Sequence, residues 1–348
     1  MQEPFSKLLG LATGAYATQR SLNGGPGYRG APTDHFDGKV FRNQNPAATA
    51  GRTLTDFVRW QRTGRRTRWP VQVENSVRPR LPPRLEGCEL AVTYVNHATL
   101  LLQFPGLNVL TDPVYSDRVS PVQWSGPRRV RPPGLAFEQL PRIDVVLVSH
   151  NHYDHLDLDT LRRLERDHRP RVLTGLGNQA FLAEHGLTRV AEFDWWQQTM
   201  HENARITFTP AQHWSGRSLG GRNRTLWGGF AIETTERRAM FAGDTGYWRH
   251  FREIRARFGR MDLALLPIGA YEPRWFMADQ HMDPDEAVRA HLDLEARLSV
   301  GMHFGCFQLT DEGIDAPVLA LEQARQTHGV PREAFRAPET GETIMLLD

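Results

Sequence analysis

The stretch from Val146 to Asp157 most constrains the fold of this chain, because an apolar run is followed there by several side chains that can bind a metal. Its sequence is VLVSHNHYDHLD, and four potential ligands follow the order H-x-H-x-D-H: His150, His152, Asp154 and His155. A buried strand that ends in a turn can spread such side chains around one point. Imidazoles and carboxylates suit zinc, and an open position on zinc lowers the pKa of a bound water to about 7. The sequence therefore predicts a zinc site after this strand.

Three further candidate ligands also follow predicted strands. His213 comes after the apolar segment 205–209, Asp244 after 239–242 and His303 after 298–302. One His or Asp at a strand end is an ordinary loop residue, but the seven residues together make a set for two metals. Such sites hold their ions about 3.5–4 Å apart. We assign His150, His152 and His213 to one ion, Asp154, His155 and His303 to the other, and Asp244 to a bridging position.

The order of predicted elements indicates an α+β fold. Strands are predicted at 90–95, 99–104, 108–111, 144–149, 171–174, 205–209, 229–233, 239–242, 263–268 and 298–302. Helices are predicted at 53–60, 158–166, 179–185, 248–258, 283–292 and 317–329. Strands come early in each half of the chain and helices later. Two packed sheets with helices outside bury all of these apolar faces.

The ligand pattern resembles that of the metallo-β-lactamase superfamily, which combines H-x-H-x-D-H with a distant His, an Asp in G-D-T and a final His. The segments 149–157 and 267–277 further resemble the family of phospholipases D that hydrolyse N-acyl-phosphatidylethanolamine. The likeness runs from about Thr93 to Gly329. It implies an αββα sandwich with two Zn²⁺ at one edge between the sheets. It also implies hydrolysis of a phosphodiester, with N-acylethanolamine and phosphatidate as products.

Two residues are predicted to act in catalysis. Asp154 is expected to bind metal and to orient the attacking hydroxide. His281 stands just before a helix that begins with Asp283 as N-cap, where the helix dipole favours an anion. The resemblance places the matching histidine at the active site, so we expect His281 to contact the phosphate. The alternative is a histidine that only stabilises a turn.

Five other residues are candidates for support of the site or for contact with substrate. Asp157 is expected either to orient a metal-bound imidazole or to cap the helix from Leu158. His97, between two strands, is expected to be a buried support rather than a ligand. Tyr153 and Trp214 neighbour predicted ligands, and Tyr271 lies in the run that resembles the phospholipase family. For the aromatic residues, core packing is the alternative.

The chain is expected to comprise an N-terminal extension or cap, residues 1–85, packed on a catalytic domain of residues 86–348. Five side chains of the extension either dock on a membrane, contact a second copy in a homodimer, or belong to a segment that only covers apolar surface of the sandwich: Phe57, Trp60, Arg65, Arg66 and Trp69. Residues 8–17 resemble a signal peptide only faintly, because the apolar run is short and interrupted. No apolar run approaches the length of a membrane span. We expect a cytoplasmic protein that contacts membranes reversibly.

The formal net charge of +2 gives no indication of nucleic-acid binding. The expected substrate is a phospholipid or another phosphodiester. The same metal site also suits small phosphodiesters, lactones and β-lactams, so these remain alternatives for a metallo-hydrolase. A metal-binding protein without turnover is the second alternative.

Overall fold

The computed structural model contains two seven-stranded sheets packed face to face, and it describes residues 27–49, 52–87, 89–218 and 220–347. The first sheet has the order β14-β1-β2-β3-β4-β5-β6. Its strands are β1 (Leu90–Asn96), β2 (Thr99–Phe104), β3 (Leu107–Thr111), β4 (Val145–Val148), β5 (Arg171–Gly175), β6 (Val190–Phe193) and β14 (Thr343–Leu346).

The second sheet has the order β13-β12-β11-β10-β9-β8-β7. Its strands are β7 (Gln198–His201), β8 (Ala204–Thr209), β9 (Gly229–Glu233), β10 (Arg238–Phe241), β11 (Leu263–Pro267), β12 (Leu298–Met302) and β13 (Phe335–Arg336). Each sheet is antiparallel on one side and parallel on the other, with the change at β3 in the first and at β10 in the second. The two halves of the sandwich are therefore built alike.

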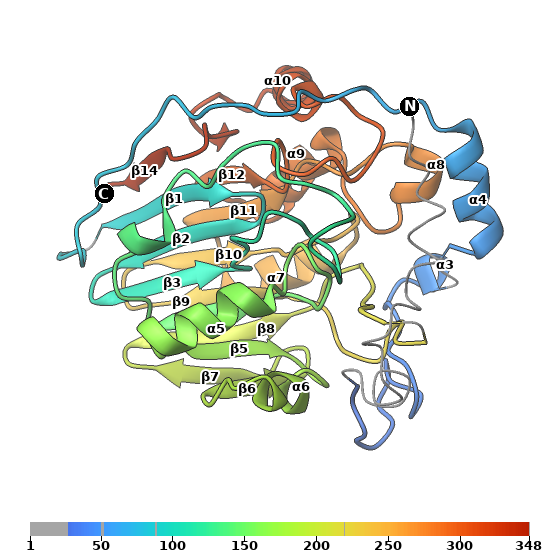
Figure 1. Cartoon of the computed structure of the whole chain (residues 1–348). Coiled ribbons are helices and arrows are strands. Elements are labelled where there is room, and N and C mark those ends of the chain that lie inside the picture. The colour runs from blue at the N-terminus through green and yellow to red at the C-terminus, as the bar shows by residue number, and fades with distance from the viewer. Residues whose placement is uncertain (1–26, 50–51, 88, 219, 348) are drawn as a thin grey trace.

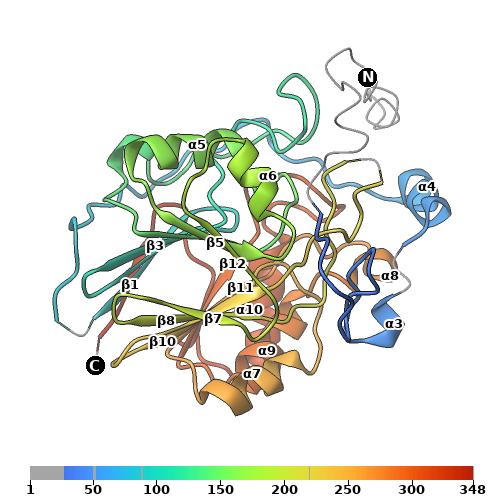
Figure 2. The same cartoon turned by 90° about the horizontal axis from the view of Figure 1, so that it is seen from below.

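Helices cover both outer faces of the sandwich, as Figure 2 shows. Near the first sheet lie η1 (Phe137–Gln139), α5 (Leu158–Asp167) and α6 (Gln179–Glu184). Against the second sheet lie α7 (His250–Phe258), α9 (Pro284–Asp293) and α10 (Ala316–His328). These layers confirm the predicted α+β sandwich. Within the described residues, no helix has the length and apolar character that crossing a membrane requires.

Alternating side chains explain why the strands take these places. In β2, Leu100 and Leu102 belong to the large core cluster, which also holds side chains of the second sheet, whereas Leu101 packs into a separate cluster with α5 and α6. In β4, Val145 packs in the first of these clusters and Val146 in the second. β4 is thus buried on both faces, as its continuous apolar run predicts.

The extension is held against the sandwich along its described length. It contains α3 (Pro46–Thr49) and α4 (Leu54–Thr63), which lie beside α8 (Arg274–Met277) (Figure 1). Phe36 and Phe41 are fully buried in the main core. Trp60 packs on Phe276, and Trp69 Nε1 donates a hydrogen bond to Glu312 O. The segment 8–17, considered above as a faint signal peptide, lies outside the described residues.

Candidate metal centre

The H-x-H-x-D-H loop follows β4 directly and is fastened at both ends. Ser149 donates hydrogen bonds from its backbone N and its Oγ to the carboxylate of Asp112 at 2.7 and 2.6 Å. At the other end, Asp157 caps α5 by accepting from the backbone N of Asp159 and Thr160. The strand and the helix cap therefore fix where the loop between them presents its side chains.

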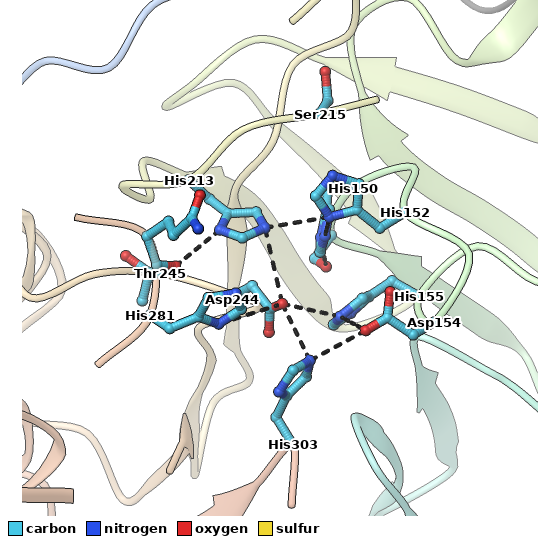
Figure 3. Close-up of polar contacts among 12 residues, drawn as sticks. His150, His152, Asp154, His155, His213, Ser215, Asp244, Thr245, His281 and His303 are labelled. Atoms are coloured by element: carbon cyan, nitrogen blue, oxygen red, sulfur yellow. Dashed lines mark hydrogen bonds and ion pairs between the residues drawn. The ribbon is translucent and has the colours of Figure 1, made fainter. Parts of the chain in front are cut away.

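The structure brings all seven predicted ligands together with His281 (Figure 3). Among the described residues, four overlapping groups of side chains each place their ligand atoms within 4.8 Å of one another. Two of these groups, which share no residue, are His150, His152 and His213, and His97, Asp154, His155 and His303. Asp244 lies between the groups, because its Oδ2 is 3.8 Å from His213 Nε2, 3.1 Å from His155 Nε2 and 3.2 Å from His303 Nε2. This is the arrangement that a bridging carboxylate needs.

Hydrogen bonds fix the tautomers of the first group. Gln280 O can only accept, so His213 Nδ1 donates to it at 2.9 Å. The Ser149 hydroxyl donates its hydrogen to Asp112, so it can only accept from His150 Nδ1, at 2.9 Å. When neutral, both imidazoles therefore carry a lone pair on Nε2. These lone pairs point at His152 Nδ1, at distances of 2.8 Å from His150 and 3.3 Å from His213.

Three imidazole nitrogens that converge in this way suit a metal ion better than they suit one another. A single proton on His152 Nδ1 satisfies one facing lone pair and leaves the other unmatched. Burial lowers the pKa of His150 and His152 well below the usual value, and lowers that of His213 to about 4. The three rings are therefore neutral near pH 7, which is the state that binds metal.

The negative charge of the centre lies on Asp154 of the second group and on Asp244. Asp244 is buried and the side chain of Asp154 is 14% exposed, and the neighbouring imidazoles hold the pKa of both carboxyl groups well below the usual range although desolvation opposes this. Burial also opposes charge on His155 and His303, but the nearby carboxylates outweigh it. The pKa of His155 is raised well above its usual value and that of His303 to about 9. One buried and one partly buried carboxylate at the same place require cationic partners, and divalent metals are suitable partners.

Asp112 braces His155 from behind. Its fully buried Oδ2 accepts from His155 Nδ1 at 2.6 Å, which turns His155 Nε2 toward Asp154 and Asp244. Carboxylates that hold metal-binding imidazoles in this way fix ring orientation and raise ligand basicity. Asp157, a predicted candidate for this role, instead caps α5 and accepts from the backbone N of Tyr115 and Ser116. In the sequence, turn formation alone is enough to explain an Asp-Pro pair such as Asp112-Pro113, so the pair is only a weak indication of this role.

His97 and His281 flank the centre. His97 lies in a left-handed conformation (φ 45°), and its Nε2 is 3.1 Å from Asp154 Oδ2. Its ring packs on His303, with the centroids 4.0 Å apart, so it supports both side chains. His281 Nδ1 is 3.8 Å from Asp244 Oδ2, buried and without a hydrogen-bond partner. His281 therefore has a ring nitrogen ready for a bound group.

The three aromatic candidates make different contacts. Trp214 packs edge-on against His152, with the ring centroids 4.1 Å apart. Tyr153 donates its hydroxyl to Arg217 O at 2.8 Å. Tyr271 lines a pocket of about 280 Å³ between α9 and α10. Among the three, Trp214 is thus the one in direct contact with a predicted ligand.

The comparisons with known proteins agree with this geometry. Residues 107–304 match the model of the beta-lactamase superfamily domain. An uncharacterised protein of Mycobacterium tuberculosis is 37% identical over 95% of this chain and 94% of its own length. The N-acyl-phosphatidylethanolamine-hydrolyzing phospholipase D 1 of Caenorhabditis elegans is 40% identical over 63% of this chain and 65% of its own length.

A solved structure shows the same fold. It is a possible metal-dependent hydrolase from Veillonella parvula, with a TM-score of 0.59 and 17% identity, covering 74% of this chain and 99% of that one. Fold, clustered donors and relatives point to a hydrolase that uses a divalent metal. The chain belongs to the metallo-β-lactamase superfamily and, within it, resembles the phospholipases D that hydrolyse N-acyl-phosphatidylethanolamine.

Proposed function

We propose that this protein is a di-zinc phosphodiesterase that cleaves N-acyl-phosphatidylethanolamine to N-acylethanolamine and phosphatidate. The observation that carries the proposal is the likeness to the Caenorhabditis elegans protein, whose name states that activity. His150, His152 and His213 would hold one ion, and Asp154, His155 and His303 the other, with Asp244 shared. When bound, such a metal pair activates a water molecule and neutralises charge on phosphoryl oxygens.

The residues of the chain act around that pair. His97 holds Asp154 in place through the contact between His97 Nε2 and Asp154 Oδ2. His281, with an unpartnered ring nitrogen, donates a hydrogen bond to a phosphoryl oxygen of the substrate. The oxygen of the attacking water bonds to phosphorus, and the bond from phosphorus to the oxygen of the N-acylethanolamine breaks. The departing alkoxide takes up a proton, so that the products are a phosphate monoester and an alcohol.

Substrate in a bilayer requires contact with the membrane. Trp60 and Trp69, two predicted docking residues, are engaged with the domain instead. Nearby, Val58 is 41% and Trp275 37% exposed, and the Arg59 guanidinium stacks 4.6 Å from the Trp275 ring. We propose that these three side chains contact the membrane. An arginine near anionic lipid contributes about 1 kcal/mol to the binding free energy. Co-sedimentation with anionic vesicles checks it, with loss of binding expected at high salt.

The activity is tested with zinc-loaded protein and N-acyl-phosphatidylethanolamine in vesicles, with products identified by mass spectrometry. We expect N-acylethanolamine and phosphatidate in equal amounts, no turnover with Asp154→Asn, and a loss on the order of 10²-fold with His281→Ala. The matched control is His328→Ala, a histidine that pairs with Asp285 on the surface, and it should turn over like wild type. A lactone and a β-lactam run in parallel. Turnover of either of these without cleavage of the phospholipid would overturn the assignment.

A further inference from the structure

The backbone of the proposed ligand His213 is held by a residue of the extension, Asn43. His213 comes four positions after the end of β8 at Thr209, so no sheet hydrogen bond fixes it. Its backbone N donates to Asn43 Oδ1 at 3.0 Å, and its carbonyl accepts from Asn43 Nδ2 at 2.9 Å. One side-chain amide thus closes a ring of two hydrogen bonds on the His213 backbone. Asn43 precedes the matched domain, residues 107–304, by more than sixty positions.

The amide of Asn43 is itself held rigidly. Trp227, which is fully buried, donates from Nε1 to Asn43 Oδ1 at 3.2 Å. Two residues earlier, Phe41 lies fully buried in the main core, and its backbone N donates to Asn223 O at 2.7 Å. Because Asn43 is anchored by these neighbours, its orientation is imposed on His213 and does not follow it.

Asn45 adds a second contact at the same place. Its Nδ2 donates to Gln212 Oε1 at 2.9 Å, and Gln212 Nε2 donates in turn to Asp279 O at 2.9 Å. The residue before the ligand is thus tied both to the extension and to the segment that leads to His281. Asn43 fixes the backbone of His213 while Gln280 O fixes its ring through Nδ1. Backbone and ring are therefore set by different parts of the chain.

We infer that Asn43 and Asn45 are positioning residues of the metal centre, and that the extension completes the half of the centre formed by His150, His152 and His213. His213 is only 1% exposed. Among the described residues, Asn43 is the only hydrogen-bond partner that the structure records for its backbone N and its carbonyl oxygen, and both bonds are lost without Asn43. Buried backbone groups rarely remain unpaired, so the loop would shift to satisfy them. His213 would then leave the point where its lone pair meets those of the other two imidazoles.

This inference rests on the proposed function, which requires a pair of metal sites. A zinc titration distinguishes failure of the inference from failure of the proposed function. The metal-free wild type, Asn43→Ala, Asn45→Ala and Asn75→Ala are titrated with Zn²⁺ against a chromophoric chelator, with circular dichroism as the check of folding. Asn75 is the matched control: it also lies in the extension and also donates from Nδ2 to a backbone carbonyl, that of Pro132 at 2.8 Å. If the wild type fails to take up two equivalents, the proposed function fails, and the inference falls with it.

The expected result is selective. Asn43→Ala should weaken one zinc equivalent by about 10- to 100-fold, the cost typical of losing a residue that orients a ligand, and leave the other unchanged. Asn45→Ala should weaken the same equivalent to a smaller extent, and Asn75→Ala neither. Equal weakening of both equivalents in Asn43→Ala, or the same loss in Asn75→Ala, would show a general effect on folding and overturn the inference. Should Asn43→Ala not fold, unchanged zinc affinity in Asn45→Ala would overturn it.

Discussion

Replacing Asp112 by Asn tests how far a buried carboxylate outside the ligand set controls the metal centre. Asp112 Oδ1 accepts from the backbone N of Ser149, and an amide oxygen placed there keeps that bond. The amide nitrogen then stands where Oδ2 was, 2.6 Å from His155 Nδ1, and cannot accept from it. His155 is thereby forced either to lose a hydrogen bond or to move its proton to Nε2, the nitrogen that faces the metal position.

The size of the effect at His155 follows from the bond that Oδ2 accepts from His155 Nδ1, and the bond from Ser149 Oγ to the same Oδ2 is lost as well. A hydrogen bond to a charged group contributes about 1.5–3 kcal/mol. At about 1.4 kcal/mol per factor of ten, that is a loss of zinc affinity of roughly 10- to 150-fold. The loss should be larger for the equivalent that contains His155. A smaller effect is expected at the other equivalent, because Ser149 links Asp112 to His150.

The assay is a zinc titration of the metal-free variant against a competing chelator. Asp157→Asn is the matched control, since Asp157 is also a buried aspartate beside the ligand loop but caps α5. It should cost stability and leave both zinc affinities near wild type. If Asp112→Asn binds both equivalents as tightly as wild type, or if Asp157→Asn loses as much affinity, the account of how His155 is oriented is wrong.

Three further outcomes are expected. His97→Phe keeps a ring beside His303 but removes the donor to Asp154 Oδ2, so turnover should fall by about 10- to 100-fold while the thermal midpoint stays near that of wild type. Phe41→Ala should lower the free energy of unfolding by about 3–5 kcal/mol in urea titrations, because the side chain is fully buried; a loss near zero would contradict the packing of the extension. Burial opposes charge on His35, but its carboxylate partners, Asp194 first, outweigh this and raise its pKa above 6.5. Its contribution to stability should therefore be complete below pH 6.5 and be lost as pH rises through the raised pKa, and urea titrations of His35→Gln across that range should lack this part of the pH dependence.

The sequence predicts the fold well where burial or capping requires a recognisable pattern of residues. β4 is a continuous apolar run, and Asp283 with Glu286 forms the capping box that begins α9, as its sequence indicates. β7 was missed because it is a half-exposed strand at the edge of its sheet with a polar sequence. β14 was missed because it pairs with β1, a strand that lies about 250 positions earlier in the chain. No local pattern reports such a pairing.

The candidate site divides in the same way. The seven proposed ligands could be named because chemistry demands particular side chains directly after strands, and the structure brings these side chains together. Their roles as ligands remain a prediction. The residues that orient them were not predictable to the same degree, since asparagine in a Gly- and Pro-rich segment is ordinary. Asn43 meets His213 across 170 positions, and only the folded chain brings the two together.

The most direct test of the central claim is cleavage of N-acyl-phosphatidylethanolamine in water enriched in ¹⁸O. Attack of water on phosphorus predicts one ¹⁸O atom in the phosphate group of phosphatidate and none in N-acylethanolamine. The two products are separated and the ¹⁸O content of each is measured by mass spectrometry, with Asp154→Asn as the inactive comparison. Label in N-acylethanolamine would show cleavage at carbon, and label in a released fatty acid would show hydrolysis of an acyl ester or an amide. Either result would contradict a phosphodiesterase built on these residues.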